Sequence, residues 1–201
     1  VVRALETLLR RPVELTCAGR TDAGVHALAQ YVSVPLSTAE LGLDARRLSH
    51  GLSALLPDDI SPSQLYRAPA GFSARFDARS RSYRYRIVAG QARPVLAWDH
   101  ALVGEHDFKS FCKATSAEGK PTHRCVMSLG VHEENECGER VTCIDVAGNA
   151  FLHSMVRTIT GTLVEVGPGQ RDAGWVAKAL AACDRKAAGP CAPAKGLTFV
   201  G

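Results

Sequence analysis

The residues best suited to chemistry stand in one polar segment near the start of the chain, CAGRTDAGVHALAQ at residues 17–30. The segment brings a cation, a carboxylate and an imidazole together as Arg20, Asp22 and His26, among glycines. Glycine allows sharp turns and close approach of a ligand, and catalytic groups tend to lie on loops held by a rigid scaffold. The competing interpretation is an Asp that hydrogen-bonds its own turn backbone, and spacing alone favours it.

A second candidate, Arg157, stands in the apolar segment FLHSMVRTITGTLVEVG at residues 151–167. An isolated cation in an apolar helix normally has a partner, although solvation on the helix surface is the alternative. His153 lies one helical turn earlier and is predicted to share a face with Arg157. The apolar stripe that predicts a buried helix here consists of Leu152, Met155, Val156, Ile159 and Leu163.

A third candidate, Tyr83, lies in a strand predicted at residues 80–88. Side chains alternate along a strand, so Tyr83 shares one face with Arg81, Tyr85 and Ile87. This stretch is also rich in cations, a density that suits phosphate contacts, although a solvated basic strand edge is the alternative. The five arginines of this basic cluster are Arg75, Arg79, Arg81, Arg84 and Arg86.

The elements that must position these residues follow from the periodicity of apolar residues and from breakers such as Pro12 and Pro57. Helices are predicted at 5–9, 44–56, 107–114, 151–167 and 172–183, and strands at 13–17, 28–34, 60–67, 80–88, 126–133, 140–147 and 197–200. The last strand is predicted at a sheet edge. Asp44 and Asp172 are predicted to cap the helices that follow them.

The order of these elements predicts an α+β fold with mostly antiparallel strands and helices packed on one face. We expect two similar lobes that share a largely antiparallel central sheet, with the active-site cleft between the lobes. The Gly- and Pro-containing residues 89–94 are the predicted boundary. The expected domains are 1–88, an N-terminal α+β lobe carrying the Asp22 loop, and 89–201, a C-terminal α+β lobe carrying the FLHSMVR helix.

Composition excludes several classes of protein. The 201 residues are 46% hydrophobic and 22% charged, close to the average of globular domains. No stretch approaches the roughly 18 consecutive apolar residues of a membrane span, and no secretory signal begins the sequence, so a cytoplasmic location is expected. The net charge of +4 permits a polyanionic partner. Seven cysteines without a C-x2-C pair argue against a zinc site or a disulfide framework.

The motifs resemble those of a known enzyme family, the TruA-type tRNA pseudouridine synthases. CAGRTDAGVHA, at residues 17–27, is similar to the catalytic motif of that family over eleven unbroken residues. Three later segments resemble its other motifs in the same order, so the likeness covers nearly the whole chain. These segments are LLPDDI at 55–60, FSARFDARSRSYRYRI at 72–87 and NAFLHSMVRTITGTLVEVG at 149–167.

The resemblance implies that the chain is an enzyme, an isomerase that converts uridine to pseudouridine at positions 38, 39 and 40 in the anticodon arm of tRNA. In this reaction the bond between N1 and C1′ breaks and C5 of the rotated uracil bonds to C1′. The family uses no cofactor and no metal. Its members are commonly homodimers that bind one tRNA with both subunits, and nothing in the sequence implies a membrane partner.

The resemblance also assigns roles to individual residues. Asp22 corresponds to the nucleophile, which attacks either C6 of the uracil or C1′ of the ribose. Arg20 corresponds to the residue that replaces the flipped nucleotide, and Tyr83 to an active-site Tyr that stacks on the uracil and assists proton removal at C5. Arg157 corresponds to the cation that pairs with the nucleophile and keeps it ionised. We expect His26, like His153, to contact RNA or to satisfy local hydrogen bonds.

The sequence departs from the family pattern at three places. A strand with a Tyr-Asp-Gly-type segment usually precedes the first helix. A further strand and helix usually stand where RPVLAWDH meets ALVGEHDF, around residues 97–101, and Ser53 stands where Asn is common.

Two other functions remain open from the residues alone. A tRNA-binding or tRNA-folding protein without catalytic activity could keep the same fold, but it would gain nothing from a carboxylate facing RNA. A carboxylate-dependent hydrolase would need a second acid or a metal cluster near Asp22, and the sequence contains no motif for either.

Overall fold

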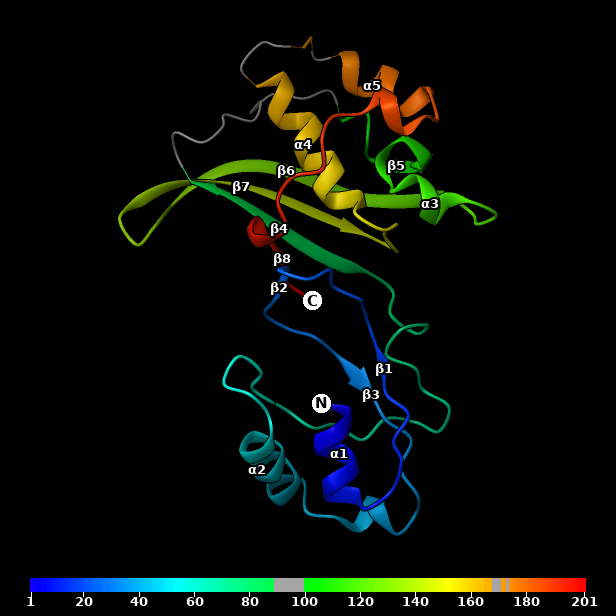
Figure 1. Ribbon diagram of the computed structural model, residues 1–201, viewed down its shortest axis with the longest axis vertical. Helices are drawn as coiled ribbons and strands as arrows, with labels where there is room; N and C mark the ends of the chain where they lie inside the picture. Colours follow the sequence, from blue (N-terminus) through cyan, green and yellow to red (C-terminus); the bar gives the residue numbers. More distant parts are fainter. Residues whose placement is uncertain (89–99, 168–170, 173) are drawn as a thin grey trace. The chain divides into compact units, whose positions relative to one another are not determined.

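The computed structural model describes residues 1–88, 100–167, 171–172 and 174–201 (Figure 1). The chain forms two compact units, one of Val1–Gly19 with Tyr31–Ala78 and the other of Arg20–Gln30 with Arg79–Gly201. The predicted boundary at 89–94, and most of the departure around 97–101, lie outside the described residues. The domains 1–88 and 89–201 therefore stay a prediction.

The smaller unit is built on two amphipathic helices, α1 (Val2–Leu9) and α2 (Ala45–Leu55), whose apolar faces share a small core. The predicted cap is confirmed, because the Asp44 side chain accepts a hydrogen bond from the backbone N–H of Arg46 at 2.8 Å. Most residues of the strands predicted at 13–17, 28–34 and 60–67 do not form strands. Only β1 (Thr16–Cys17) and β3 (Val32–Ser33) pair here, antiparallel, and residues 60–67 form no strand.

The larger unit is built on a six-stranded sheet with the order β2-β8-β4-β7-β6-β5. All neighbours are antiparallel except β2 and β8, which run parallel, so the prediction of a largely antiparallel sheet is confirmed. The strand at the C-terminus lies inside the sheet, between β2 and β4, and not at its edge as predicted. The strands are β2 (His26–Ala27), β4 (Arg81–Val88), β5 (Gly104–Asp107), β6 (His123–Glu136), β7 (Glu139–Gly148) and β8 (Leu197–Phe199).

Helices cover one face of this sheet, as predicted (Figure 1). The principal one, α4 (Met155–Val166), buries most of its side chains against the core, and α5 (Gly174–Ala181) packs beside it. The alternation predicted for β4 is confirmed, since Tyr83, Tyr85 and Ile87 are all buried in that core. The shorter helices are α3 (Ala114–Ala117) and the 3-10 turns η1 (Glu40–Gly42), η2 (Lys109–Phe111), η3 (Arg185–Ala187) and η4 (Ala194–Gly196).

The principal helix begins four residues later than predicted. Residues 151–154 form a turn, in which Ser154 adopts a left-handed conformation with φ of 61°. The predicted helix at 107–114 is likewise divided into η2 and α3.

None of the helices in the described part of the chain has the length and apolar character that crossing a bilayer requires.

A close backbone contact fixes α4 against the segment that follows α5. A Cβ atom at Gly161 would overlap the carbonyl oxygen of Pro190, so the two backbones touch where a side chain would stand. The contact is reinforced by the N–H of Gly189, which donates to the hydroxyl of Thr162 at 2.9 Å. The segment therefore lies flat on the helix, and its next residues reach the first turn of α4.

This contact predicts that Gly161→Ala lowers the free energy of unfolding by about 1–3 kcal/mol, because a methyl group in a packed interior displaces its surroundings. Urea unfolding followed by circular dichroism measures the change.

Gly130→Ala is the matched control, since a Cβ at that position meets no atom within 4 Å. An effect of Gly161→Ala no larger than that of the control would contradict the close contact.

Candidate functional site

The loop that carries Asp22 is a tight turn docked on the edge of the large sheet. The N–H of Val25 donates to the carbonyl of Asp22 at 3.0 Å, and Gly24 adopts φ of 82°, as the third residue of a type II turn does. Directly after the turn, β2 pairs with β8, and the N–H of Leu28 donates to Phe199 at 2.8 Å. These bonds hold the backbone on both sides of the carboxylate.

Arg157 reaches Asp22 from the first turn of α4. Its Nη1 donates to Oδ2 of Asp22 at 3.0 Å, and its Nε donates to the carbonyl of Ala192 at 2.7 Å. The Ala192 N–H in turn donates to the Arg157 carbonyl at 3.0 Å, so two bonds lock helix and segment together. The guanidinium is 19% exposed and the carboxylate 33%, so the ion pair is partly shielded from water. The bond is charge-assisted, and it fixes the position of Oδ2.

A second partner of Asp22 is His153, whose Nε2 lies 3.3 Å from Oδ1. The other ring nitrogen, Nδ1, lies 3.1 Å from the hydroxyl of Ser116 on α3. His153 stands in the turn before α4, so it does not share a helix face with Arg157 as predicted, yet both side chains meet the same carboxylate. The helical periodicity that grouped the two residues gave no sign of this contact, because it depends on the irregular turn at Ser154.

Tyr83 lies on β4 with only 8% of its surface exposed. Its ring contacts Phe151 edge-on, with centroids 5.2 Å apart, and Phe199 at 5.1 Å. Burial raises the pKa of the Tyr83 phenol. The charge of Arg81 lowers this pKa by less, and the charge of Asp22, the smallest of the three effects, raises it. The phenol therefore lies within range of the Asp22 charge. Because its pKa is raised, it stays neutral at physiological pH.

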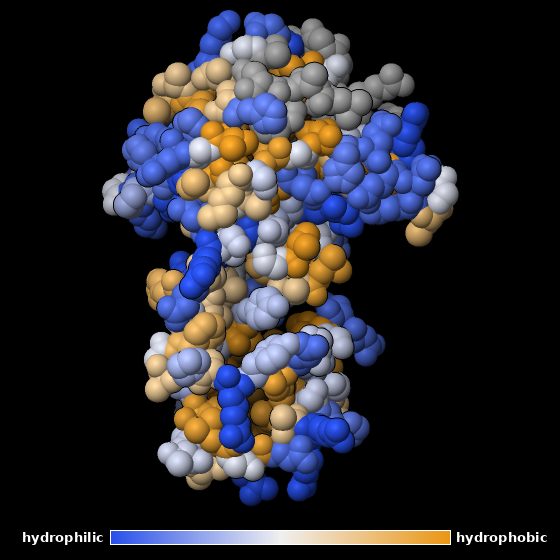
Figure 2. Space-filling model, turned by 180° about the vertical axis from the view of Figure 1, so that it is seen from behind, coloured by the Kyte–Doolittle hydropathy of each residue, from blue (hydrophilic) through white to orange (hydrophobic). Residues whose placement is uncertain are grey.

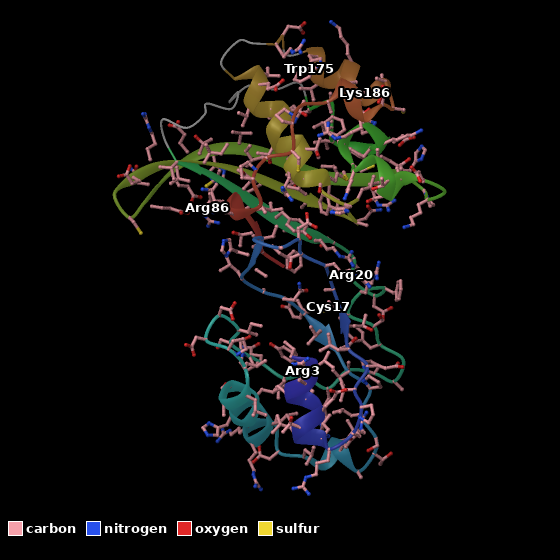
Figure 3. The ribbon with its side chains drawn as sticks, viewed as in Figure 1. Arg3, Cys17, Arg20, Arg86, Trp175 and Lys186 are labelled. Atoms are coloured by element: carbon pink, nitrogen blue, oxygen red, sulfur yellow. The ribbon has the colours of Figure 1, made fainter. Side chains whose placement is uncertain are left out.

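The other two predicted site residues, Arg20 and His26, form no hydrogen bond or ion pair with these side chains in the part of the chain that the structure describes. Arg20, in the loop before Asp22 (Figure 3), is exposed, and within the described part of its unit its guanidinium forms no hydrogen bond or ion pair. His26 is exposed on β2, opposite Thr198 of β8. Both side chains remain accessible to a ligand.

Two of the five arginines in the basic cluster, Arg84 and Arg86, differ from the prediction. Arg84 binds Asp145 through two nitrogens, at 2.7 and 2.9 Å, and also binds Glu134 at 3.1 Å. The bond to Asp145 raises the pKa of Arg84 above its ordinary value. Arg86, labelled in Figure 3, binds Glu136 at 2.9 Å. Both arginines are thus neutralised by acids and offer little charge to a phosphate, and β4 lies inside the sheet, so the alternative of a basic edge is also wrong.

These acids belong to the surface at one end of the large sheet. Figure 2 shows hydrophilic surface there, over the hairpin formed by β6 and β7, and again at the opposite end near α3. At the hairpin end the charges are mixed, since acidic side chains of β6 face the arginines of β4.

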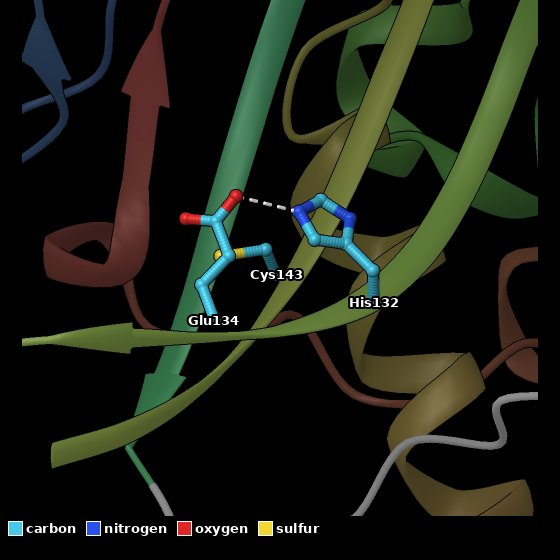
Figure 4. A group of neighbouring side chains, drawn as sticks. All are labelled: His132, Glu134 and Cys143. Atoms are coloured by element: carbon cyan, nitrogen blue, oxygen red, sulfur yellow. Dashed lines mark hydrogen bonds and ion pairs between the residues drawn. The ribbon is translucent and has the colours of Figure 1, made fainter.

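A group with donor atoms suitable for a metal lies on the same face. The donor atoms of His132, Glu134 and Cys143 all lie within 4.8 Å of one another (Figure 4), and nitrogen, oxygen and sulfur are the donors that zinc accepts. Protein partners already use these donors. Glu134 accepts from His132 at 2.8 Å and from Arg84, while burial raises the pKa of the Cys143 thiol, which opposes the thiolate that a metal needs. The group fits an ion network better than a metal site.

Comparison with known proteins agrees with the motifs. Residues 100–201 match a family described as "tRNA pseudouridine synthase". The chain is 38% identical over 216 residues to "tRNA pseudouridine synthase A" of Xanthomonas oryzae pv. oryzae (strain PXO99A), covering 98% of this chain and 81% of the relative. It is 37% identical over 217 residues to the protein of the same name in Stenotrophomonas maltophilia (strain K279a), covering 99% and 82%.

The environment of Tyr83 predicts that its phenol ionises above pH 10, the ordinary value being about 10. Absorbance of phenolate in an alkaline titration measures this, and the difference between the wild type and Tyr83→Phe isolates the one side chain. A free tyrosine amide in the same buffer serves as the reference. A difference curve with its midpoint at or below that of the reference would contradict the burial of Tyr83 beside a negative charge.

Proposed function

The chain belongs to the tRNA pseudouridine synthase family, and from that premise we propose that Asp22 is the nucleophile of an isomerase that acts on the anticodon arm. The substrates we propose are uridines at positions 38, 39 and 40 of tRNA. The observation that supports this proposal best is the pair of Asp22 and Arg157, with 3.0 Å between Oδ2 and Nη1.

The chemistry requires an ionised carboxylate that persists when a neutral base enters the site. A base that displaces water weakens the hydration of the carboxylate and favours its protonation, whereas a fixed guanidinium opposes this change. Arg157 suits the role because Ala192 holds its Nε and leaves Nη1 directed at Asp22. A charged oxygen can then attack C6 of the uracil or C1′ of the ribose and form a short-lived covalent adduct.

The isomerisation is balanced without an external reactant. The bond from N1 to C1′ breaks, the uracil turns, C5 bonds to C1′, and the proton on C5 is lost while N1 gains one. We propose that Tyr83 contacts the uracil and assists removal of the C5 proton. Its neutral phenol, held between Phe151 and Phe199, is suited to stacking and to hydrogen bonding.

Two exposed residues are proposed to bind the RNA around the reacting uridine. Extrusion of a nucleotide costs a few kcal/mol, and a cation near the distorted backbone offsets part of that cost. Arg20 suits this role because it stands two residues before Asp22 and is exposed. His26, exposed four residues after Asp22, is proposed to contact the same RNA.

Several broader features are proposed from the family resemblance alone. They are a homodimer in which one tRNA contacts both subunits, a cytoplasmic location, and two similar lobes, 1–88 and 89–201, with the active site in a cleft between them. Reaction without a cofactor or metal is proposed on the same ground.

The proposal predicts that Asp22→Asn lowers tritium release from C5-labelled tRNA by at least about 1000-fold, since loss of a nucleophile removes most of a rate enhancement. Binding of tRNA should change by less than about threefold, because the substitution removes no cation. Release by the wild type should require uridine at position 38, 39 or 40, and tRNAs with cytidine at all three should release none.

Asp172→Asn is the matched control, because Asp172 is 71% exposed and pairs only loosely with Lys178, at 3.7 Å. Retained release by Asp22→Asn would overturn the assignment of the nucleophile. Equal inactivity of the wild type and the variant on every tRNA would favour a binding protein, and release from the cytidine-substituted tRNAs would overturn the proposed target positions.

A further inference from the structure

The carboxylate of Asp22 has two different partners, and the proposed function uses only one of them. Oδ2 faces the guanidinium of Arg157 at 3.0 Å, and Oδ1 faces Nε2 of His153 at 3.3 Å. Each oxygen therefore has its own partner, and the two partners come from different elements. The shorter contact is with the less exposed partner, since the side chain of Arg157 is 19% exposed and that of His153 is 43% exposed.

Contacts at both ring nitrogens of His153 align its side chain. The hydroxyl of Ser116 lies 3.1 Å from Nδ1, at hydrogen-bond distance. Nε2 lies 3.3 Å from Oδ1 of Asp22, at ion-pair distance. The ring therefore bridges Ser116 and the carboxylate.

The position of His153 is set independently of Arg157. Its carbonyl accepts a hydrogen bond from the N–H of Lys113 at 3.2 Å, which ties the turn before α4 to the segment that carries Ser116. Arg157, in contrast, is held by Ala192 on the far side. Two separate supports thus fix the rotation of the carboxylate about its Cβ–Cγ bond.

We propose that His153 is a positioning residue for the isomerisation, which holds Oδ1 of Asp22 toward the uridine while Arg157 holds Oδ2. This inference rests on the proposed role of Asp22 as nucleophile. Oδ1 is the oxygen that attacks, because its partner is the more distant and the more exposed. His153 transfers no proton in this step. Its contact through Nε2 orients the oxygen before the bond to carbon forms.

Two substitutions at this position test the role. His153→Gln can place a polar nitrogen where Nε2 stands, so the single-turnover rate should stay within about threefold of the wild type. His153→Leu removes the contact with Oδ1, so the rate should fall by about 10- to 100-fold, the range for a polar interaction with a charged group. The affinity for tRNA should stay within about threefold.

The control is His123→Gln, at an exposed histidine at the start of β6, and it should keep the wild-type rate. The positioning role is overturned if His153→Leu matches the wild-type rate, or if His153→Gln is as slow as His153→Leu. If His153→Leu loses affinity for tRNA, the rate of His153→Gln at saturating tRNA decides. Asp22→Asn is measured alongside, because activity in that variant would overturn the nucleophile itself, whereas its inactivity leaves the histidine results to judge the positioning role alone.

Discussion

The ion pair between Asp22 and Arg157 is the interaction on which the site depends. It joins a loop at the edge of the large sheet to the first turn of the helix that covers the sheet, over a sequence separation of 135 residues. Exposed ion pairs contribute little to stability, and this one is partly exposed, so its value lies in the charge and the orientation that it gives the carboxylate. The guanidinium can serve in this way because the carbonyl of Ala192 holds its other side.

The surrounding fold accounts for the precision of that contact. The helix α4 is buried along most of its length, and the segment that carries Ala192 lies against it where Gly161 leaves room for the backbone of Pro190. On the other side of the carboxylate, the turn closed by Asp22 and Val25 leads into β2, which pairs with the last strand. The acid and its cation are thus each fixed by backbone contacts and not by flexible side chains alone.

Long elements with a strong apolar period could be predicted from the sequence. Strands β4, β6 and β7 and helices α2 and α4 were predicted within a few residues of their bounds, and the buried face of β4 was predicted correctly. The two-residue strands β1 and β3 lie within the longer strands predicted at 13–17 and 28–34. The strand β2 was not predicted, because its pairing depends on a distant partner, β8. Residues 60–67 have strand-forming composition, but composition alone does not supply a neighbour to pair with.

The site was predictable only in part for the same reason. The motif resemblance predicts roles for Asp22 and Arg157. Residue spacing alone favours an Asp22 that only hydrogen-bonds the backbone of its own turn. The contact of His153 with Asp22 depends on the left-handed turn at Ser154, which no periodicity reveals. The neutralisation of Arg84 follows from the register of β4 against β7, where it stands opposite Asp145. Local sequence shows the arginine but not the acid across the sheet.

The most direct test of the central claim is the single-turnover rate of Arg157→Gln on tRNA labelled at C5, measured together with its tRNA affinity. Glutamine keeps a hydrogen-bond donor but removes the charge. If the guanidinium keeps Asp22 ready to react, the rate should fall by about 10- to 100-fold, the range for an interaction with a charged group, while the affinity stays within about threefold. A variant that folds, binds tRNA and turns over at the wild-type rate would contradict the account.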